Sequence, residues 1–536
     1  MCGIVGYVGA QQAAPILLEG LQKLEYRGYD SAGIAVLDGS TIELAKACGE
    51  IKNLLAKTHD GSDLHGYIGL GHTRWATHGA PTEANAHPHV SNDGKFAIVQ
   101  NGIIENFMEL REMLQAKGFR FHSETDTEVI VHLLDMYYTG DGNLKDTVLK
   151  TLGRLEGSYA IGILCADCPE QMFLARNGCP LIIGVGAGEN FFASDVTALV
   201  SHTKNVVYLD DGELAEVRAD SYTVFDCTGK PIEKPVSRVA WDIEAAEKGG
   251  YEHFMFKEIM EQPEAIRKTI SPRLKNGKIV LDDVSLSKED LEKISKIVVL
   301  ACGSAYHVGM NAKYILEKIA RIPVEVDLAS EFRYRDPIID ESVLVLVISQ
   351  SGETADTLAA LREAKRLGAR VISIVNVVGS SIANDSDDVL YTWAGPEIAV
   401  ATTKAYSTQL AVVYLLALYL GEKRNTITTD QLERYVKGLE NLPNQIQEIL
   451  EHQETIQYLA SQYFNSRDIF FIGRNLDYSM SLEGSLKLKE ISYIHSEAYA
   501  AGELKHGTIS LIEDGTLVVS LATQDMLFDK MMSNVK

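Results

Sequence analysis

Cysteine is the second residue of the chain, in the sequence Met1-Cys2-Gly3-Ile4. If the initiator methionine is removed, Cys2 carries both a thiol nucleophile and a free α-amine, which titrates near pH ~8. Because an unactivated thiol is mostly protonated at neutral pH, a base within reach solves the main problem of cysteine catalysis. Position alone leaves open an alternative, a small apolar residue that opens a strand.

Four further motifs of charged, small and polar residues follow within the first 130 residues. They are residues 27–33 (RGYDSAG), 71–79 (GHTRWATHG), 99–102 (VQNG) and 123–128 (SETDTE). In type and order, these motifs resemble the class II glutamine amidotransferases over roughly residues 1 to 240. Glutamine presents an α-carboxylate, an α-ammonium and a neutral amide, so the site that the resemblance implies needs an arginine, an acid and an oxyanion hole.

The resemblance implies a role for each motif residue. Arg74 would bind the α-carboxylate and Asp126 the α-ammonium, while Asn101 and the Gly102 backbone N–H would stabilise the oxyanion. The remaining residues that the resemblance places at the glutamine pocket are Trp75, Thr77 and His78. Cys2 would be the nucleophile.

Local alternatives exist for several of these residues. Asp126 could be an acid at a helix N-terminus, and Asn101-Gly102 is also a common hairpin dipeptide. The nearby histidines invite a metal-site interpretation, but their His-x5-His and His-x-His spacings lack a Cys or carboxylate partner in a recognisable ligand frame. We therefore expect no metal and no organic cofactor.

Composition indicates a globular chain. Its 536 residues allow three or four domains, 46% of them are hydrophobic, and the seven cysteines do not make a disulfide framework. The longest strongly apolar segment, 410–420, is too short to span a bilayer and predicts a buried helix. The net charge of −24 disfavours nucleic acid or an anionic membrane as partner. A working thiol favours a reducing compartment, so we expect a cytoplasmic protein.

The pattern of predicted elements changes near residue 240. Residues 1–240 show short strands and turns with a few helices, which suits an α+β layered sandwich, and the resemblance implies the four-layer form of amino-terminal-nucleophile enzymes. Residues 241–290 are charged and helical and predict a linker. Residues 291–425 and 450–536 repeat strand, loop and long helix, the pattern of doubly wound α/β units.

The second half contains an internal repeat. Predicted strands begin at 297 and 343 in the first copy, and at 468 and 516 in the second. The second copy stops at Lys536, before the counterpart of the third strand at 371–375. From the repeat we expect a second copy that is incomplete by some tens of residues.

One loop of the first copy has the composition of a phosphate site. Residues 349–357 (SQSGETADT) place hydroxyl side chains and a glycine where a loop meets a helix N-terminus, which offers free N–H donors. No segment reads as a Walker loop, GxxxxGK[ST]. Simple helix capping is the alternative.

Four motifs of the second half resemble the paired sugar-isomerase (SIS) domains that bind phosphosugars. They are residues 302–304 (CGS), 349–354 (SQSGET), 397–404 (EIAVATTK) and 483–490 (EGSLKLKE). The resemblance implies phosphate contacts from Ser304, Ser349, Gln350, Ser351 and Thr354, and contacts to the sugar hydroxyls from Val400 and Thr402.

The resemblance also implies the groups for isomerisation. Glu490 would move the proton between adjacent sugar carbons, His506 would open the ring, and Lys487 would lie beside them. Lys487 and Glu490 are three residues apart and share a helix face, so a plain surface ion pair is the alternative.

The order of the two halves is similar to a family that transfers ammonia from glutamine to fructose 6-phosphate and isomerises the product to glucosamine 6-phosphate, the first step towards amino-sugar nucleotides. That resemblance implies two substrates, L-glutamine and fructose 6-phosphate, and a homodimer. Family members also carry a Schiff-base lysine in a carboxy-terminal tail beyond the counterpart of Lys536. A phosphosugar-binding protein with glutaminase activity alone is therefore the alternative. Asparagine synthetase and phosphoribosyl-acceptor motifs are not found, nor is the helix-turn-helix of a phosphosugar-binding regulator.

Overall fold

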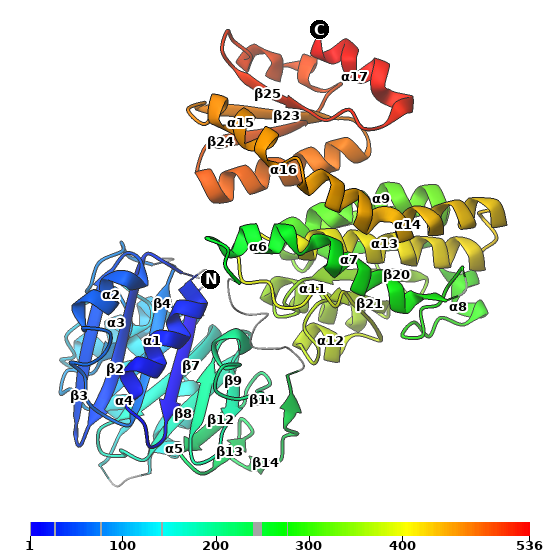
Figure 1. Cartoon of the computed structure of the whole chain (residues 1–536). Coiled ribbons are helices and arrows are strands. Elements are labelled where there is room, and N and C mark those ends of the chain that lie inside the picture. Colours follow the sequence, from blue (N-terminus) through cyan, green and yellow to red (C-terminus); the bar gives the residue numbers. More distant parts are fainter. Residues whose placement is uncertain (1, 26–27, 76–77, 141–142, 240–248, 276) are drawn as a thin grey trace. The chain divides into compact units, whose positions relative to one another are not determined.

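The computed structural model describes residues 2–25, 28–75, 78–140, 143–239, 249–275 and 277–536. The chain divides into two compact units, Met1–Glu247 and Lys248–Lys536 (Figure 1). Each unit is described by itself below.

Unit 1 contains two antiparallel sheets. The first has the order β15-β11-β9-β10-β1-β4-β2-β3, and the second has the order β14-β13-β12-β8-β7-β6-β5. The strands of the first sheet are β1 (Gly3–Val8), β2 (Ser31–Asp38), β3 (Thr41–Cys48), β4 (Ile68–Arg74), β9 (Ile182–Val185), β10 (Asn190–Ala193), β11 (Asn205–Tyr208) and β15 (Ser237–Arg238). Those of the second are β5 (His89–Val90), β6 (Phe96–Ile104), β7 (Gly157–Cys165), β8 (Gln171–Asn177), β12 (Leu214–Arg218), β13 (Tyr222–Phe225) and β14 (Pro231–Ile232).

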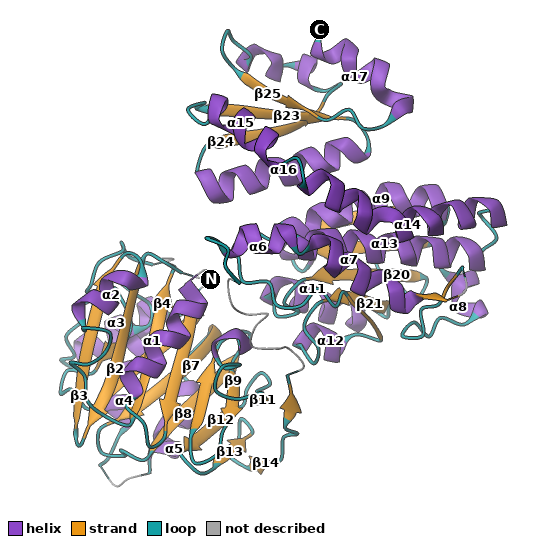
Figure 2. Ribbon diagram, in the orientation of Figure 1, coloured by secondary structure: helices purple, strands orange, loops and turns teal. Residues whose placement is uncertain are grey.

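The two sheets face each other, and helices cover their outer faces (Figure 2). Side chains such as Ile4 and Leu70 of the first sheet pack against Val99 and Leu174 of the second. On the opposite face of the second sheet, Phe96 and its neighbours pack against α3 (Phe107–Ala116), α4 (Glu128–Tyr137) and α5 (Leu144–Leu152). Helices α1 (Ala13–Leu24) and α2 (Ile51–Lys57) contact the first sheet. The predicted four-layer sandwich is confirmed.

Unit 2 begins with a helical segment that joins its core. The helices are α6 (Phe254–Met260), α7 (Gln262–Ile270) and α8 (Lys288–Lys293), with a short hairpin of β16 (Leu274–Lys275) and β17 (Lys278–Ile279). Ile266 and Ile270 of α7 are buried in the main core of the unit. From α7 onward, the region predicted as a linker therefore packs into the core of the first α/β sheet.

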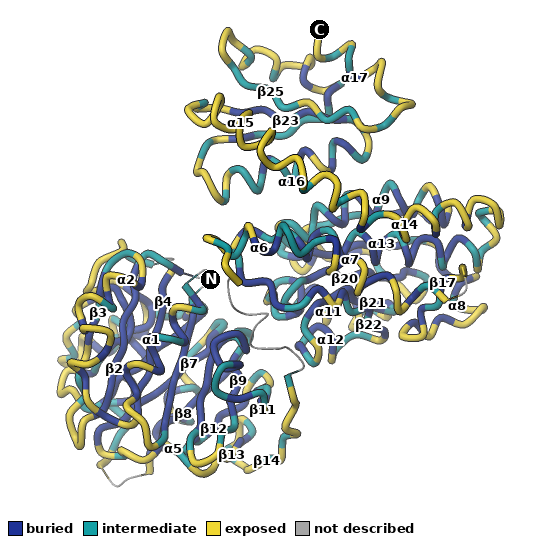
Figure 3. Tube along the Cα trace, viewed as in Figure 1, coloured by how far each residue is buried: buried dark blue, intermediate teal, exposed yellow. Residues whose placement is uncertain are grey.

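The first sheet of unit 2 is parallel, with the order β19-β18-β20-β21-β22. Its strands are β18 (Lys296–Ala301), β19 (Val324–Leu328), β20 (Val343–Ser349), β21 (Arg370–Val375) and β22 (Asp388–Tyr391). One face packs against α7, α9 (Ser304–Ile319), α13 (Lys404–Lys423) and α14 (Thr429–Leu450). The other face packs against α10 (Ala329–Phe332), α11 (Ala355–Arg366) and α12 (Ser381–Asp385). Because both faces are covered, the three central strands β18, β20 and β21 are buried along nearly all of their length, as the dark tube in Figure 3 shows, whereas the edge strands β19 and β22 are partly exposed.

The second parallel sheet repeats the first three strands. Its order is β24-β23-β25, formed by β23 (Asp468–Gly473), β24 (His495–Ala500) and β25 (Leu517–Ser520), with α16 (Leu476–Ser492) joining β23 to β24. The order of β19, β18 and β20 is the same, and α9 joins β18 to β19. The predicted pair of doubly wound units is confirmed. Helix α15 (Gln453–Tyr463) precedes the second copy, and α17 (Phe528–Val535) follows β25.

The apolar segment 410–420 lies inside α13, where most residues are buried. It is a core helix, as predicted. Among the helices of the described residues, none has both the length and the apolar character that a membrane crossing requires.

Candidate functional site

In unit 1, Cys2 lies immediately before β1, beside the end of β4. The antiparallel pairing of β1 with β4 sets Gly3 opposite Thr73, so the chain start meets Arg74 and Trp75. The Trp75 N–H donates to the Cys2 Sγ at 3.2 Å, and the thiol is 3.5 Å from the Trp75 carbonyl oxygen. Sheet register alone therefore holds the predicted nucleophile next to a residue 73 positions away.

The predicted oxyanion donor reaches the same place from the second sheet. Asn101 lies in β6, and its Nδ2 donates to the Cys2 carbonyl oxygen at 3.1 Å. Asn101 and Gly102 pair with Ala160 and Tyr159 inside the sheet. The hairpin-dipeptide alternative is therefore wrong.

Gly102 occupies a position that no side chain could share. Its φ is +106°, and an added Cβ would lie 2.1 Å from the Ser158 carbonyl oxygen. Only glycine meets both conditions without strain. The missing side chain at Gly102 was predicted to let a substrate come close. It is also required for β7 to pair beside β6.

The two charged residues predicted to bind glutamine are held by backbone groups. The Arg74 guanidinium donates to the carbonyl oxygens of His78, Gly79 and Ala80, at 3.3 Å for Ala80 and 3.2 Å for Gly79. Asp126 accepts a 2.8 Å hydrogen bond from the Ile104 N–H, two residues after Gly102. The carboxylate is thereby fixed to the end of β6 rather than to the first turn of α4.

Burial raises the pKa of the Cys2 thiol, although the Trp75 N–H and the charge of Arg74 oppose the rise. A thiol that stays protonated at neutral pH needs a base to become a nucleophile. Burial also raises the pKa of Asp126, against the Ile104 N–H and the charges of His78 and Arg74. An ammonium ligand would stabilise the ionised form of this buried acid.

Two of the three remaining residues predicted for the glutamine pocket, Trp75 and His78, are described by the structure. The indole of Trp75 is 43% exposed and meets Tyr29 edge to face, and the His78 ring meets Phe107 in the same manner. Thr77 lies outside the described residues. No group of three or more His, Cys, Asp or Glu side chains in the described ranges has the arrangement of a metal site.

In unit 2, the predicted phosphate residues follow two neighbouring parallel strands. Ser304 is the first residue of α9, after β18, and Ser349 ends β20. Carboxyl ends of parallel strands meet at one edge of the sheet, where ligands of doubly wound folds bind. The two predicted phosphate segments therefore lie at the same edge.

Hydroxyl groups of the loop after β20 converge on one another. The Ser349 Oγ accepts from the Gly352 N–H at 3.1 Å and lies 3.1 Å from the Thr354 Oγ1, and the Ser351 Oγ accepts from the Glu353 N–H at 3.2 Å. Thr354 is the N-cap residue of α11, but its side chain makes no capping hydrogen bond. The capping alternative does not account for this hydroxyl. The backbone carbonyl of Gln350 accepts from the Asn376 N–H at 3.0 Å and ties the loop to the end of β21.

A buried acid that the sequence did not single out holds the loop containing Val400 and Thr402. Glu258 of α6 accepts hydrogen bonds from the N–H groups of Ile398, at 2.5 Å, and Ala399, at 3.1 Å. Burial and the charge of Glu397 raise the pKa of Glu258 to about 7. Only its place in a charged, helical segment was visible from sequence.

Three further contacts complete this loop. Thr402 donates its hydroxyl hydrogen to Glu397, and the Thr403 N–H donates to the same carboxylate at 2.8 Å. The Lys404 Nζ lies 2.6 Å from Glu261 Oε2. Val400 is 53% exposed, so its side chain is open to a ligand.

The isomerase residues on α16 form a chain of charges that reaches α9. Lys487 is ion-paired with Glu490 and lies 3.4 Å from Glu483, whose other oxygen is 2.7 Å from the Nδ1 of His307. The Lys487 side chain is 16% exposed and that of Glu483 is 7% exposed. This partly buried network is not a plain surface ion pair. His307 lies three residues after Ser304, so the network links the two repeats near the phosphate loop.

The structure does not join His506 to this network. It ends a short 3₁₀ helix, Leu504–His506, and is exposed. Among the described residues, its side chain makes no hydrogen bond or ion pair with Lys487 or Glu490. The residues that sequence reasoning missed are Glu258, His307 and Glu483. Glu258 and His307 lie in none of the motifs, and Glu483 opens the motif 483–490, in which only Lys487 and Glu490 were assigned roles.

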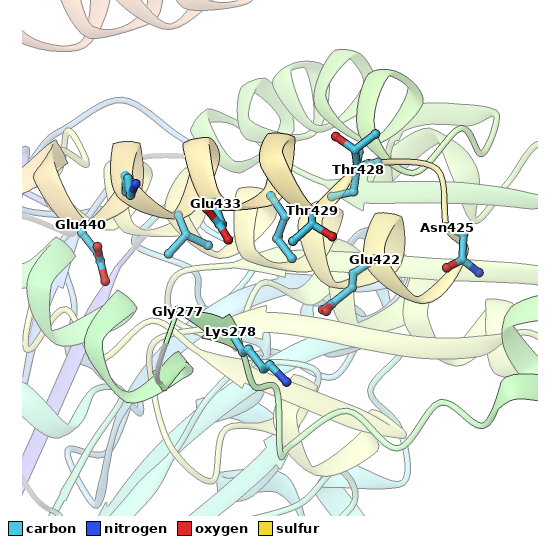
Figure 4. A pocket seen from close by; sticks show the side chains of 12 residues that line it. Gly277, Lys278, Glu422, Asn425, Thr428, Thr429, Glu433 and Glu440 are labelled. Atoms are coloured by element: carbon cyan, nitrogen blue, oxygen red, sulfur yellow. The ribbon is translucent and has the colours of Figure 1, made fainter.

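A cavity of unit 2 lies away from these residues. It has a volume of 540 Å³ and lies between the β17 hairpin, the end of α13 and the start of α14 (Figure 4). Glu422, Glu433 and Glu440 face it together with Lys278. None of its lining residues is a predicted site residue.

Comparisons with known proteins agree with the order of the two halves. The glutamine amidotransferase domain matches residues 50–240, and the SIS domain matches residues 290–419 and 462–536. Proteins named glutamine–fructose-6-phosphate aminotransferase [isomerizing] are 57% identical in Caldanaerobacter subterraneus subsp. tengcongensis and 56% identical in Clostridium tetani, over 100% of this chain and 88% of theirs. The solved C-terminal domain of glucosamine-fructose-6-phosphate aminotransferase from Francisella tularensis is 43% identical, with a TM-score of 0.52, over 54% of this chain and 81% of that one. The chain therefore belongs to the glutamine–fructose-6-phosphate aminotransferase (isomerizing) family.

Proposed function

We propose that this chain hydrolyses glutamine at Cys2 and transfers the ammonia to fructose 6-phosphate, giving glutamate and glucosamine 6-phosphate. The observation that carries the proposal is the group of hydrogen bonds around Cys2. A thiol just before β1, a backbone N–H just after β4 and a side-chain amide from within β6 meet there, at 3.2 Å for Trp75 N–H to Cys2 Sγ and 3.1 Å for Asn101 Nδ2 to Cys2 O. A nucleophile beside an amide donor is what amide hydrolysis requires.

In the glutaminase step, the Cys2 thiol gives its proton to the general base, and the sulfur attacks the side-chain carbonyl carbon of glutamine. The carbonyl oxygen becomes an oxyanion, and the Asn101 amide and the Gly102 N–H donate to it. The C–N bond breaks, ammonia leaves with a proton from the general base, and water hydrolyses the thioester to glutamate. Once Met1 is removed, the base is the α-amine of Cys2. Arg74 binds the α-carboxylate and Asp126 the ammonium, with Trp75, Thr77 and His78 around them.

In the sugar step, phosphate binds at the carboxyl edge of the first parallel sheet of unit 2. The hydroxyls of Ser304, Ser349, Ser351 and Thr354 and the amide of Gln350 donate to it, as do free N–H groups at the helix starts. Val400 and Thr402 contact the sugar hydroxyls. Ammonia condenses with the carbonyl carbon of the sugar, whose oxygen leaves as water. Glu490 then moves a proton between adjacent carbons.

The charge network of α16 supports the roles proposed for Lys487 and Glu490. Lys487 stands between two carboxylates, which keeps its ammonium in place beside Glu490. His506 is the ring-opening group of this proposal. Relatives at 57% and 56% identity carry the name of the whole synthase, so the glutaminase-only alternative is not favoured.

The proposal extends to assembly, compartment and boundaries. We propose a homodimer, to be tested by light scattering during size-exclusion chromatography, and a cytoplasmic location, to be tested by cell fractionation. The proposed boundaries are 1–240, 241–290, 291–425 and 450–536, and limited proteolysis tests them.

The experiment that tests the function measures glutamate and glucosamine 6-phosphate in parallel. The purified chain should release glutamate from glutamine, and fructose 6-phosphate should be converted in the same reaction. Cys2→Ala should abolish glutamate release, whereas Glu490→Gln should abolish only the sugar product. A chain that releases no glutamate after Met1 removal, verified by intact mass, contradicts the glutaminase proposal. Loss of both products in Glu490→Gln contradicts the division of roles.

A further inference from the structure

His72 connects the two sheets of unit 1 directly behind the proposed oxyanion donor. It lies in β4, is fully buried, and its Nε2 is 3.1 Å from the Asn101 Oδ1 and 3.1 Å from the Gln100 carbonyl oxygen. The amide nitrogen of Asn101 faces the Cys2 carbonyl, which can only accept. The amide oxygen therefore faces His72, and the imidazole must carry its hydrogen on Nε2 to donate to both oxygens.

The other edge of the ring is fixed by packing rather than by hydrogen bonds. The His72 Nδ1 is buried and has no hydrogen-bond partner among the residues that the structure describes, and the ring stacks on His87 with centroids 4.1 Å apart. His87 is held in turn, because its Nδ1 accepts from the Gln100 N–H at 3.3 Å and its Nε2 lies 3.3 Å from the Thr127 Oγ1. Thr127 donates to the Gln100 side chain at 2.6 Å. The stack leaves His72 little freedom to turn away from Asn101.

The charge state of His72 suits this contact. Burial lowers the pKa of His72 to about 3, and the positive charge of Arg74 acts in the same direction. The ring is therefore neutral across the physiological range. It carries one hydrogen, on the nitrogen that faces Asn101.

We propose that His72 is a positioning residue of the glutaminase, which fixes the rotation of the Asn101 amide so that its N–H2 group faces Cys2 and the oxyanion. The two ends of an amide are nearly equal in size, so packing alone does not select one rotation. With the amide reversed, a carbonyl oxygen would face the developing negative charge. This inference rests on the proposed glutaminase activity and adds a residue that does not touch substrate.

The test compares two substitutions of nearly equal volume. His72→Gln keeps an N–H donor near the position of Nε2, whereas His72→Leu removes it. Glutamate release should fall at least tenfold in kcat for His72→Leu, with KM for glutamine changed less than threefold, and His72→Gln should recover most of the rate. Loss of an entire oxyanion donor costs roughly 10²–10³ in kcat, which sets the upper bound. The matched control is His132→Leu, another fully buried histidine of unit 1, which should keep the wild-type rate within threefold.

A double-substitution cycle separates positioning from general damage. With Asn101→Ala already present, His72→Leu should lower kcat no further, because the amide that it positions is gone. An equal loss in both backgrounds, or an undiminished rate for His72→Leu alone, would overturn the inference. If His72→Leu does not fold, the comparison of His72→Gln with His72→Asn replaces it. The Asn nitrogen falls near Nδ1, so His72→Asn should stay impaired, and equal rates would again overturn the inference. An unsubstituted chain that releases no glutamate overturns the glutaminase proposal itself.

Discussion

Glu258 gives the structure its clearest pH-dependent prediction, through the substitution Glu258→Gln. Glu258 is 2% exposed, and its carboxylate accepts hydrogen bonds from the N–H groups of Ile398 and Ala399. Burial first, and then the charge of Glu397, raise its pKa from 4.5 to about 7. Glutamine keeps the shape and an acceptor oxygen but cannot ionise.

The sign of the effect follows from proton binding. Between about pH 4.5 and 7 the folded chain keeps this proton and the unfolded chain has lost it, so the stability of unit 2 falls as pH rises through that window. The raised pKa corresponds to about 2.5 pH units, or about 3 kcal/mol at ~1.36 kcal/mol per unit. About 2 kcal/mol of this stability is lost between pH 5.5 and 8.5. The loss occurs only from pH 5.5 up to the folded pKa of about 7, because both states are ionised above that pKa.

The assay is differential scanning calorimetry of wild type and Glu258→Gln at these two pH values. The unit 2 transition is the one that fructose 6-phosphate raises, since a ligand that binds only the folded state stabilises it. A change of 1 kcal/mol in stability shifts Tm by about 2 °C. The Tm of wild type minus the Tm of Glu258→Gln should therefore fall by roughly 4 °C from pH 5.5 to pH 8.5. The control is Glu440→Gln, an exposed carboxylate on α14, for which the difference should not change with pH. A Glu258→Gln difference that is the same at both pH values would refute the reasoning.

The remaining predictions concern the two proposed sites. Cys2→Ala should reduce glutamate release to background while the Tm rise caused by fructose 6-phosphate stays unchanged, and a preparation that retains Met1 by intact mass should be nearly as inactive; full activity with Met1 present would exclude the α-amine as base. Arg74→Ala should cost roughly 2–4 kcal/mol in kcat/KM for glutamine, and a glutamine analogue without the α-carboxylate should lose little further in the variant; equal sensitivity of both proteins would remove the assignment. Gly102→Ala should lower Tm of unit 1 by an amount equivalent to at least ~1–3 kcal/mol, because its Cβ would lie 2.1 Å from the Ser158 carbonyl oxygen at a φ of +106°; an unchanged Tm would mean that β7 yields easily. Ser351→Ala should weaken fructose 6-phosphate binding about fivefold by isothermal titration calorimetry, the equivalent of ~1 kcal/mol for one lost hydrogen bond, and an unchanged Kd would place the phosphate elsewhere.

The sequence determined the parts of this protein that depend on residue type and short spacing. The cysteine at position 2 and the motifs around Arg74 and Asn101 pointed to glutamine chemistry before any fold was known. The repeat of strand, loop and helix predicted two doubly wound sheets, because strand and helix periods are local properties of the chain. The apolar segment within α13 was identified as a core helix for the same reason.

Tertiary structure decided which of these groups meet. His72 and Asn101 are 29 residues apart, Glu258 and Ile398 are 140 apart, and His307 and Glu483 are 176 apart. Each pair joins elements whose facing sides are set by the packing of apolar side chains elsewhere in the core. A histidine in a strand or a glutamate in a helix reads the same in sequence whether it faces water or a buried acceptor. Burial removes the competing water, so such polar pairs acquire a fixed geometry only after the sheets and helices have packed.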